Sequence, residues 1–145
     1  LRDGRAMTMG GREVKLARHG FARKQEWKLE EQSDNMVVLS LSSADHAELL
    51  EQYPYPFKIV ARYTIDAEKV AVSYEVTNEG TEDMPFFVGG HPGFKCPLDE
   101  GESYDDYELR FEQREAAELC TAVPSTGLID VEHRSKNPMV GPRTL

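Results

Sequence analysis

Two neighbouring stretches of the chain alternate between apolar and polar residues as strands do. From Phe57 to Ile65 every second residue is apolar, and the run from Val70 to Val76 repeats the pattern. Because successive side chains of a strand point to opposite faces, each run predicts a strand with one buried face. The short link Asp66-Ala67-Glu68 between them predicts an antiparallel hairpin.

The remaining elements are expected to be short. Further strands are expected at Glu26–Glu31, Met36–Leu41, Met84–Val88 and Tyr107–Phe111, the last being the clearest of the shorter runs. A turn is expected at Asn78-Glu79-Gly80, where Asn and Gly tolerate positive φ. Many strands joined by short turns predict an all-β fold, an antiparallel β-sandwich.

One short helix is expected in this otherwise β pattern. Ser42 or Ser43 can cap its first turn, and Ala47 and Leu50 are spaced as neighbours on a helix. Pro54 and Pro56 stop it, because proline cannot donate a backbone hydrogen bond.

The composition is that of a globular protein, with 39% hydrophobic and 30% charged residues. At 145 residues, one domain spanning 1–145 is expected. The net charge of -9 argues against nucleic acid and anionic membranes as partners. The chain has neither a signal-peptide pattern nor an apolar run of roughly 18 residues, so we expect a soluble, cytoplasmic protein.

The cysteines and histidines do not form a metal-binding pattern. Cys96 and Cys120 lack the CxxC spacing, which predicts two reduced and mostly buried thiols. None of the four histidines pairs with another at the spacing of a helical metal site, so we expect no metal.

His91 is a candidate proton donor. It follows Gly89-Gly90, which leaves room for a ligand near the backbone, and Pro92 fixes the direction in which the chain leaves. An imidazole held in this way can exchange a proton near neutral pH. The structural alternative is a histidine that is hydrogen-bonded at a tight turn.

A second candidate group begins at His19 and continues through Gly20-Phe21-Ala22-Arg23 to Glu26-Trp27. An imidazole, a guanidinium and an aromatic face together recognise a neutral sugar, which makes Arg23 a candidate substrate-binding residue. The structural alternative is that Arg23 pairs with a surface carboxylate and Trp27 belongs to the core.

Three segments resemble, in order and spacing, the LacX-like branch of the aldose 1-epimerase (galactose mutarotase) family. They are His19-Gly20-Phe21-Ala22-Arg23 with Glu26-Trp27, Tyr53-Pro54-Tyr55-Pro56-Phe57, and Met84-Pro85-Phe86 with Gly89-Gly90-His91-Pro92-Gly93-Phe94-Lys95-Cys96-Pro97. The resemblance spans Leu1 to Ile129 and is weak after Ser135.

The resemblance implies a galactose mutarotase-like supersandwich that binds an aldose on an open face and interconverts its α and β anomers. No cofactor or metal is implied. His91 matches the family's acid, which protonates the ring oxygen, and His19 matches a histidine that contacts the sugar. The family's base is a glutamate that takes the proton from the anomeric hydroxyl.

The sequence departs from the family at both ends. Family members continue past the position of Leu145, so the glutamate and an aspartate of the site are expected outside this chain, as is an arginine before Leu1. We therefore expect an incomplete sandwich that is inactive alone. It either self-associates through unpaired sheet edges or apolar faces, or is one piece of a longer chain. A non-catalytic carbohydrate-binding module and a sandwich without a ligand remain alternatives. The motifs do not say which sugar is bound or whether it is phosphorylated.

Overall fold

The computed structural model describes residues 4–17, 19–112 and 117–136. The chain divides into two compact units, Leu1–Val88 and Gly89–Leu145, and each is described by itself. The single domain spanning 1–145 stays a prediction.

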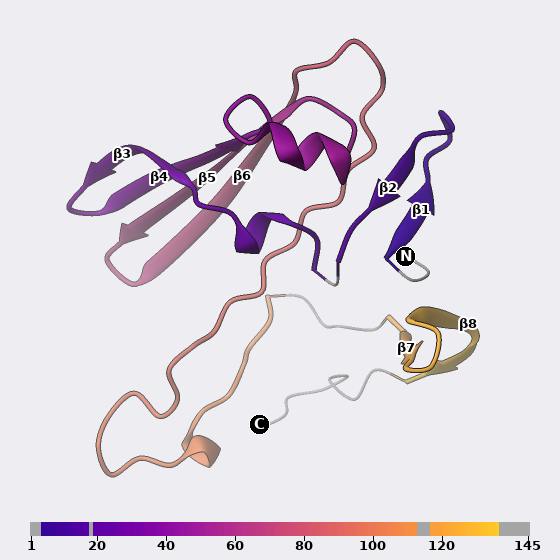
Figure 1. Ribbon diagram of the computed structural model, residues 1–145. Helices are drawn as coiled ribbons and strands as arrows, with labels where there is room; N and C mark the ends of the chain where they lie inside the picture. The colour runs from indigo at the N-terminus through magenta and orange to yellow at the C-terminus, as the bar shows by residue number, and fades with distance from the viewer. Residues whose placement is uncertain (1–3, 18, 113–116, 137–145) are drawn as a thin grey trace. The chain divides into compact units, whose positions relative to one another are not determined.

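The N-terminal unit is built on a four-stranded antiparallel sheet. Its strands, in the order β3-β4-β5-β6, are Lys28–Ser33, Met36–Ser42, Phe57–Asp66 and Lys69–Asn78 (Figure 1). A separate two-stranded sheet consists of β1 (Arg5–Met7) and β2 (Glu13–Lys15). The all-β antiparallel fold expected from the sequence is confirmed.

The β5–β6 hairpin follows the alternating pattern closely. Its register runs without interruption from the pair Phe57 and Asn78 to the pair Asp66 and Lys69. The turn is shorter than expected, because Asp66 still belongs to β5 and only Ala67-Glu68 connects the strands. Ala67 has a φ of 47°, in the left-handed region that such tight turns require.

One face of this sheet carries the core at one end. The buried cluster consists of Val14, Leu41, Leu49, Tyr53, Tyr55 and Phe57. These residues come from β2, from the adjoining ends of β4 and β5, and from the segment between those two strands. The same face becomes exposed toward the β5–β6 turn, where Ile65 and Val70 are 55% and 69% exposed.

The expected helix is short, but its start was predicted wrongly. It is the 3-10 helix η2 (Ala47–Glu51), whose N-cap is His46 without a side-chain cap. Ser43 instead binds β5, because its Oγ accepts a hydrogen bond from the Phe57 N–H at 3.0 Å. Two further 3-10 helices, η1 (Ala22–Lys24) and η3 (Tyr104–Asp106), were not expected.

The turn after β6 forms where it was expected, but a side-chain hydrogen bond closes it and not a positive φ. The Asn78 Oδ1 accepts a hydrogen bond from the Gly80 N–H at 2.9 Å. The side chain therefore closes the turn, and neither residue adopts the positive φ on which the prediction rested.

The C-terminal unit contains η3 and the antiparallel hairpin of β7 (Leu119–Val123) and β8 (Leu128–Ser135). The sequence analysis did not find these two strands. Cys96 and Cys120 are both free thiols, as expected. The expectation of burial is wrong for Cys120, which is exposed because most residues of β7 are exposed.

Two expected strands, Met84–Val88 and Tyr107–Phe111, do not form in the described residues. Pro85 cannot donate to a ladder, which weakens the first run as a strand. Tyr107 ends η3 instead, and its backbone N–H donates to the Tyr104 carbonyl at 3.3 Å. Alternation predicts a strand only where a neighbouring strand is available to pair with it.

Candidate functional site

His19 sits at a tight turn with an unusual backbone. The Gly20 N–H donates to the Ala17 carbonyl at 2.9 Å and closes the turn. His19 has a φ of 69° and Gly20 a φ of 70°. A left-handed conformation is ordinary for glycine but uncommon for histidine, and such outliers gather at functional sites. The imidazole side chain is exposed at this turn.

The residues after His19 anchor the turn to the core. The ring of Phe21 lies 5.9 Å from Tyr53 and 5.3 Å from Phe57, measured between centroids. The Trp27 Nε1 donates to the Ala22 carbonyl at 2.9 Å, and its ring packs against the buried cluster. The structural alternative is therefore correct for Trp27.

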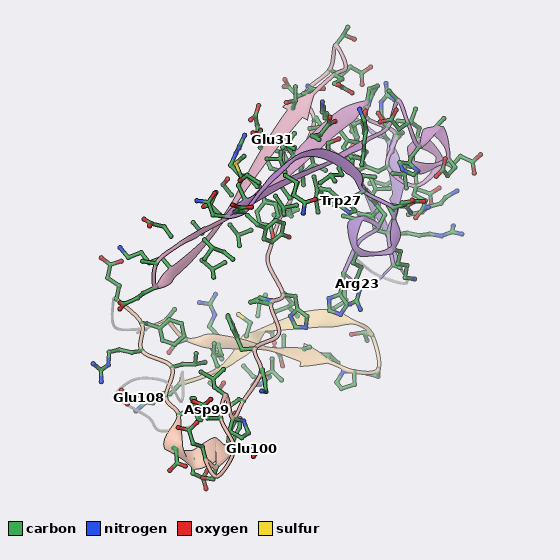
Figure 2. The ribbon with its side chains drawn as sticks, turned by 90° about the vertical axis from the view of Figure 1, so that its left-hand side faces the viewer. Arg23, Trp27, Glu31, Asp99, Glu100 and Glu108 are labelled. Atoms are coloured by element: carbon green, nitrogen blue, oxygen red, sulfur yellow. The ribbon has the colours of Figure 1, made fainter. Side chains whose placement is uncertain are left out.

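Arg23 lies in η1 and is exposed. Figure 2 shows it on the N-terminal unit together with Trp27. The structural alternative placed Arg23 in an ion pair, but its guanidinium makes none within the part of the chain that the structure describes. It therefore remains a candidate for binding a ligand.

The run that leads to His91 starts from fixed points in the N-terminal unit. The Tyr53 hydroxyl donates to the Pro85 carbonyl at 2.8 Å, and Met84 packs against the buried cluster. A Cβ added to Gly89 would meet nothing within 4 Å, so the backbone has open space around it, and His91 is exposed. The space could admit a ligand. Neither a close contact nor a positive φ requires glycine at position 89.

Tyr53 itself is a buried phenol. It is 8% exposed, and burial raises its pKa to about 12. Burial disfavours the phenolate, so Tyr53 is a hydrogen-bond donor at neutral pH.

Arg12 was missed by the sequence analysis. Its guanidinium lies 2.7 Å from the Glu82 carboxylate, donates to the Pro54 carbonyl at 3.0 Å and lies 5.5 Å from the centre of the Tyr55 ring. The Glu82 carboxylate raises the pKa of Arg12. These contacts border a surface hollow of about 350 Å³ and join the β1–β2 turn to the chain that precedes Met84. No sequence pattern brings residues 12 and 82 together.

A second hollow lies within the C-terminal unit. It measures about 570 Å³ and is lined by the loop Lys95–Glu102, which follows the His91 segment. Figure 2 labels two of its acidic residues, Asp99 and Glu100. Glu102 accepts a hydrogen bond from the Tyr107 hydroxyl, and this bond raises the pKa of Tyr107.

Neither a metal centre nor a membrane-spanning helix is found in the described part of the chain. No group of three or more His, Cys, Asp or Glu side chains is placed to hold a metal ion among residues 4–17, 19–112 and 117–136. Over the same residues, no helix is long and apolar enough to cross a bilayer.

The structure thus places His19 and Arg23 in the N-terminal unit and His91 in the C-terminal unit. His19 and Arg23 belong to one short segment, whose orientation is fixed by Phe21 and Trp27. That His91 acts on the same ligand stays a prediction.

Comparison with known proteins gives one family. The family model described as aldose 1-epimerase matches residues 2–142. The LacX proteins of Lactococcus lactis subsp. lactis, plasmid and chromosomal, are 42% identical over 121 residues, which are 83% of this chain and 40% of each relative. The chain therefore spans less than half the length of these relatives.

Solved structures agree with the family match. A galactose mutarotase related enzyme from Lactobacillus acidophilus is 26% identical with a TM-score of 0.80, over 99% of this chain and 46% of that one. A galactose mutarotase-like protein from Lactobacillus casei ATCC 334 is 26% identical with a TM-score of 0.52, over 58% of this chain and 28% of that one.

Proposed function

This chain belongs to the aldose 1-epimerase family, and on that premise we propose that the natural protein carrying it interconverts the α and β anomers of an aldose. The observation that carries the proposal is the family match over residues 2–142. The exposed His19 and His91, which lie in segments resembling the family's, support it.

The proposed reaction is an isomerisation by acid and base. His91 donates a proton to the ring oxygen, while a base removes a proton from the anomeric hydroxyl. The bond from C1 to the ring oxygen breaks and a carbonyl forms at C1. Rotation about the bond from C1 to C2, followed by the reverse steps, gives the other anomer. One proton is delivered and one is taken, and C1 has the same oxidation level in the hemiacetal and in the open-chain aldehyde. The reaction therefore needs no redox cofactor, and we propose neither a cofactor nor a metal.

We propose that the base is a glutamate outside these 145 residues. General-base assistance is commonly worth about 10²- to 10⁴-fold in rate. The 145-residue chain alone is therefore expected to bind sugar weakly and to show negligible anomerisation.

His19 and Arg23 are the proposed sugar-binding groups. The turn presents the His19 imidazole to solvent, where its ring nitrogens can reach sugar hydroxyls. Arg23 offers a planar fork of donors that suits either hydroxyls or the phosphate of a phosphorylated sugar. We propose a cytoplasmic protein, because the two free cysteines suit a reducing compartment.

Polarimetry tests the proposal. The natural protein is expected to accelerate the rotation change of freshly dissolved α-glucose or α-galactose well above buffer. His91→Asn is expected to lower the rate by about 10²-fold or more. The control is His133→Asn, because the His133 Nδ1 already lies 2.9 Å from the Asp130 carboxylate on β8.

Two outcomes would change the conclusion. A natural protein that binds sugar without accelerating anomerisation would be a carbohydrate-binding module. A His91→Asn variant that keeps full activity would show that His91 is not the acid.

A further inference from the structure

The segment that carries His19 and Arg23 is positively charged, although the chain is acidic. Residues 18–28 contain four Lys or Arg and one Glu, which gives a net charge of +3 with histidine neutral. The chain as a whole carries a net charge of -9. Charges of one sign that gather in a short segment attract ligands of the opposite sign to that part of the surface.

Two cations of this segment have no carboxylate beside them. The Lys28 Nζ lies 3.3 Å from the Glu30 carboxylate, which neutralises it. Arg23 and Lys24 are both exposed on η1, and neither forms an ion pair with any residue that the structure describes. The charge of these two side chains is therefore available to a ligand.

The backbone that carries the two cations is held at both ends. Before η1, the Phe21 ring packs against aromatic rings of the core. After η1, the Trp27 Nε1 donates to the Ala22 carbonyl at 2.9 Å, and the His46 Nε2 lies 3.1 Å from the Glu26 carbonyl oxygen. Because these contacts order the loop in advance, a ligand loses less affinity to ordering than it would on a free loop.

His19 lies within reach of the same ligand. The four residue steps from His19 to Arg23 span at most about 14 Å when the chain is fully extended. Here the path enters the 3-10 helix η1, which shortens it. The long side chains of Arg23 and Lys24 can therefore contact an anionic group of a sugar whose ring lies against His19.

We infer that Arg23 and Lys24 form an anion subsite beside His19, and that the preferred substrate is an acidic aldose, a sugar that carries a phosphate ester or a carboxylate. The inference rests on the proposed function, since it names the substrate class of that site. The planar fork of Arg23 can donate two parallel hydrogen bonds to either group, and Lys24 adds a point charge. A neutral aldose binds without these charge-assisted bonds.

Three sugars that differ only at C6 test the inference in the natural protein. Glucose, glucuronate and glucose 6-phosphate share one ring, and the same set built on galactose covers the other ring configuration. Polarimetry gives kcat/KM for each sugar above its own buffer rate. We expect at least one acidic sugar of a set to exceed its neutral partner about tenfold or more, because hydrogen bonds between charged groups are strong. The preference is expected to shrink as salt is added.

Substitutions locate the preference. Arg23→Gln is expected to lower the ratio of kcat/KM for the acidic sugar to that for the neutral sugar about tenfold. Adding Lys24→Gln is expected to lower the ratio further, whereas Arg23→Lys keeps part of it because the charge remains. The control is Lys69→Gln, which removes an exposed cation of the same unit at the start of β6 and is expected to leave the ratio unchanged.

Each outcome decides one point. A preference for glucose 6-phosphate alone assigns the subsite to phosphate, and one for glucuronate alone assigns it to carboxylate. Equal kcat/KM for acidic and neutral sugars, a ratio that survives Arg23→Gln, or an equal loss in Lys69→Gln would overturn the subsite.

Calorimetry separates the subsite from the proposed function, because it measures binding without turnover. Consider a protein that binds an acidic sugar about tenfold more tightly than the neutral one, loses this preference in Arg23→Gln and anomerises neither sugar. That result would support the subsite and contradict the proposed function. Anomerisation of neutral and acidic sugars at equal rates and affinities would do the reverse.

Discussion

At the residue scale, the His19 backbone is the feature that the sequence motif did not reveal. The segment His19-Gly20 was singled out for its side chain and its neighbouring glycine, whereas the structure puts His19 itself at a φ of 69°. A side chain in this conformation costs roughly 1–2 kcal/mol, which the surrounding turn must offset.

This strain gives a prediction for two substitutions. His19→Gly and His19→Ala both remove the imidazole and are expected to lower anomerisation equally. Glycine accepts the left-handed φ freely, so His19→Gly is expected to be more stable than His19→Ala by up to about 1 kcal/mol. Urea unfolding measures the difference. A less stable glycine variant would mean that the turn relaxes in solution.

The ionisation of Tyr53 gives a second prediction. Burial raises its folded-state pKa to about 12, whereas the pKa of a tyrosine in the unfolded chain is about 10. A raised folded pKa contributes stability that is fully present below about pH 10 and is lost as the pH rises toward about 12. Tyr53→Phe is therefore expected to unfold with a weaker pH dependence in that window than Tyr55→Phe. Parallel curves for the two variants would contradict this assignment.

At the scale of elements, the sequence predicted the strands of the main sheet but not the two short hairpins β1–β2 and β7–β8. The four strands of the main sheet were found within about two residues, because each pairs with a neighbouring strand of the same sheet. Met84–Val88 has the composition of a strand but is held by a tyrosine hydroxyl instead. Contacts between residues distant in the sequence, such as Tyr53 with Pro85, cannot be inferred from local patterns.

The uncovered end of the main sheet gives a prediction about association. Its exposed apolar residues share the core-bearing face: Leu29, Tyr63, Ile65, Val70, Val72 and Tyr74, between 38% and 69% exposed. β6 is an outer strand of this sheet. Exposed apolar faces and outer strands both favour association, so we expect the 145-residue chain to self-associate when expressed alone.

Sedimentation velocity checks this expectation. Val72→Lys places a charge on the apolar face and is expected to shift the chain toward monomer. Ser73→Lys, on the other face of the same strand, is the control and is expected to leave association unchanged. A wild-type chain that sediments as a single monomer and unfolds cooperatively would contradict the prediction.

At the scale of the whole molecule, three short motifs were enough to identify the family, because their order and spacing are hard to match by chance. The family match over residues 2–142 confirms that identification. The candidate side chains His19, Arg23 and His91 came from the motifs alone. The supporting contacts of Tyr53 and Arg12 did not, since they depend on tertiary structure.

The most direct test of the central claim follows the histidine rings during a sugar titration. In the natural protein labelled at histidine, an aldose is added while the imidazole resonances of His19, His46, His91 and His133 are recorded by NMR. If His19 and His91 bind the same sugar, both resonances shift along one saturation curve with a single Kd, and those of His46 and His133 do not move. Shifts of only one of the two rings, or two curves with different Kd values, would contradict a shared sugar site.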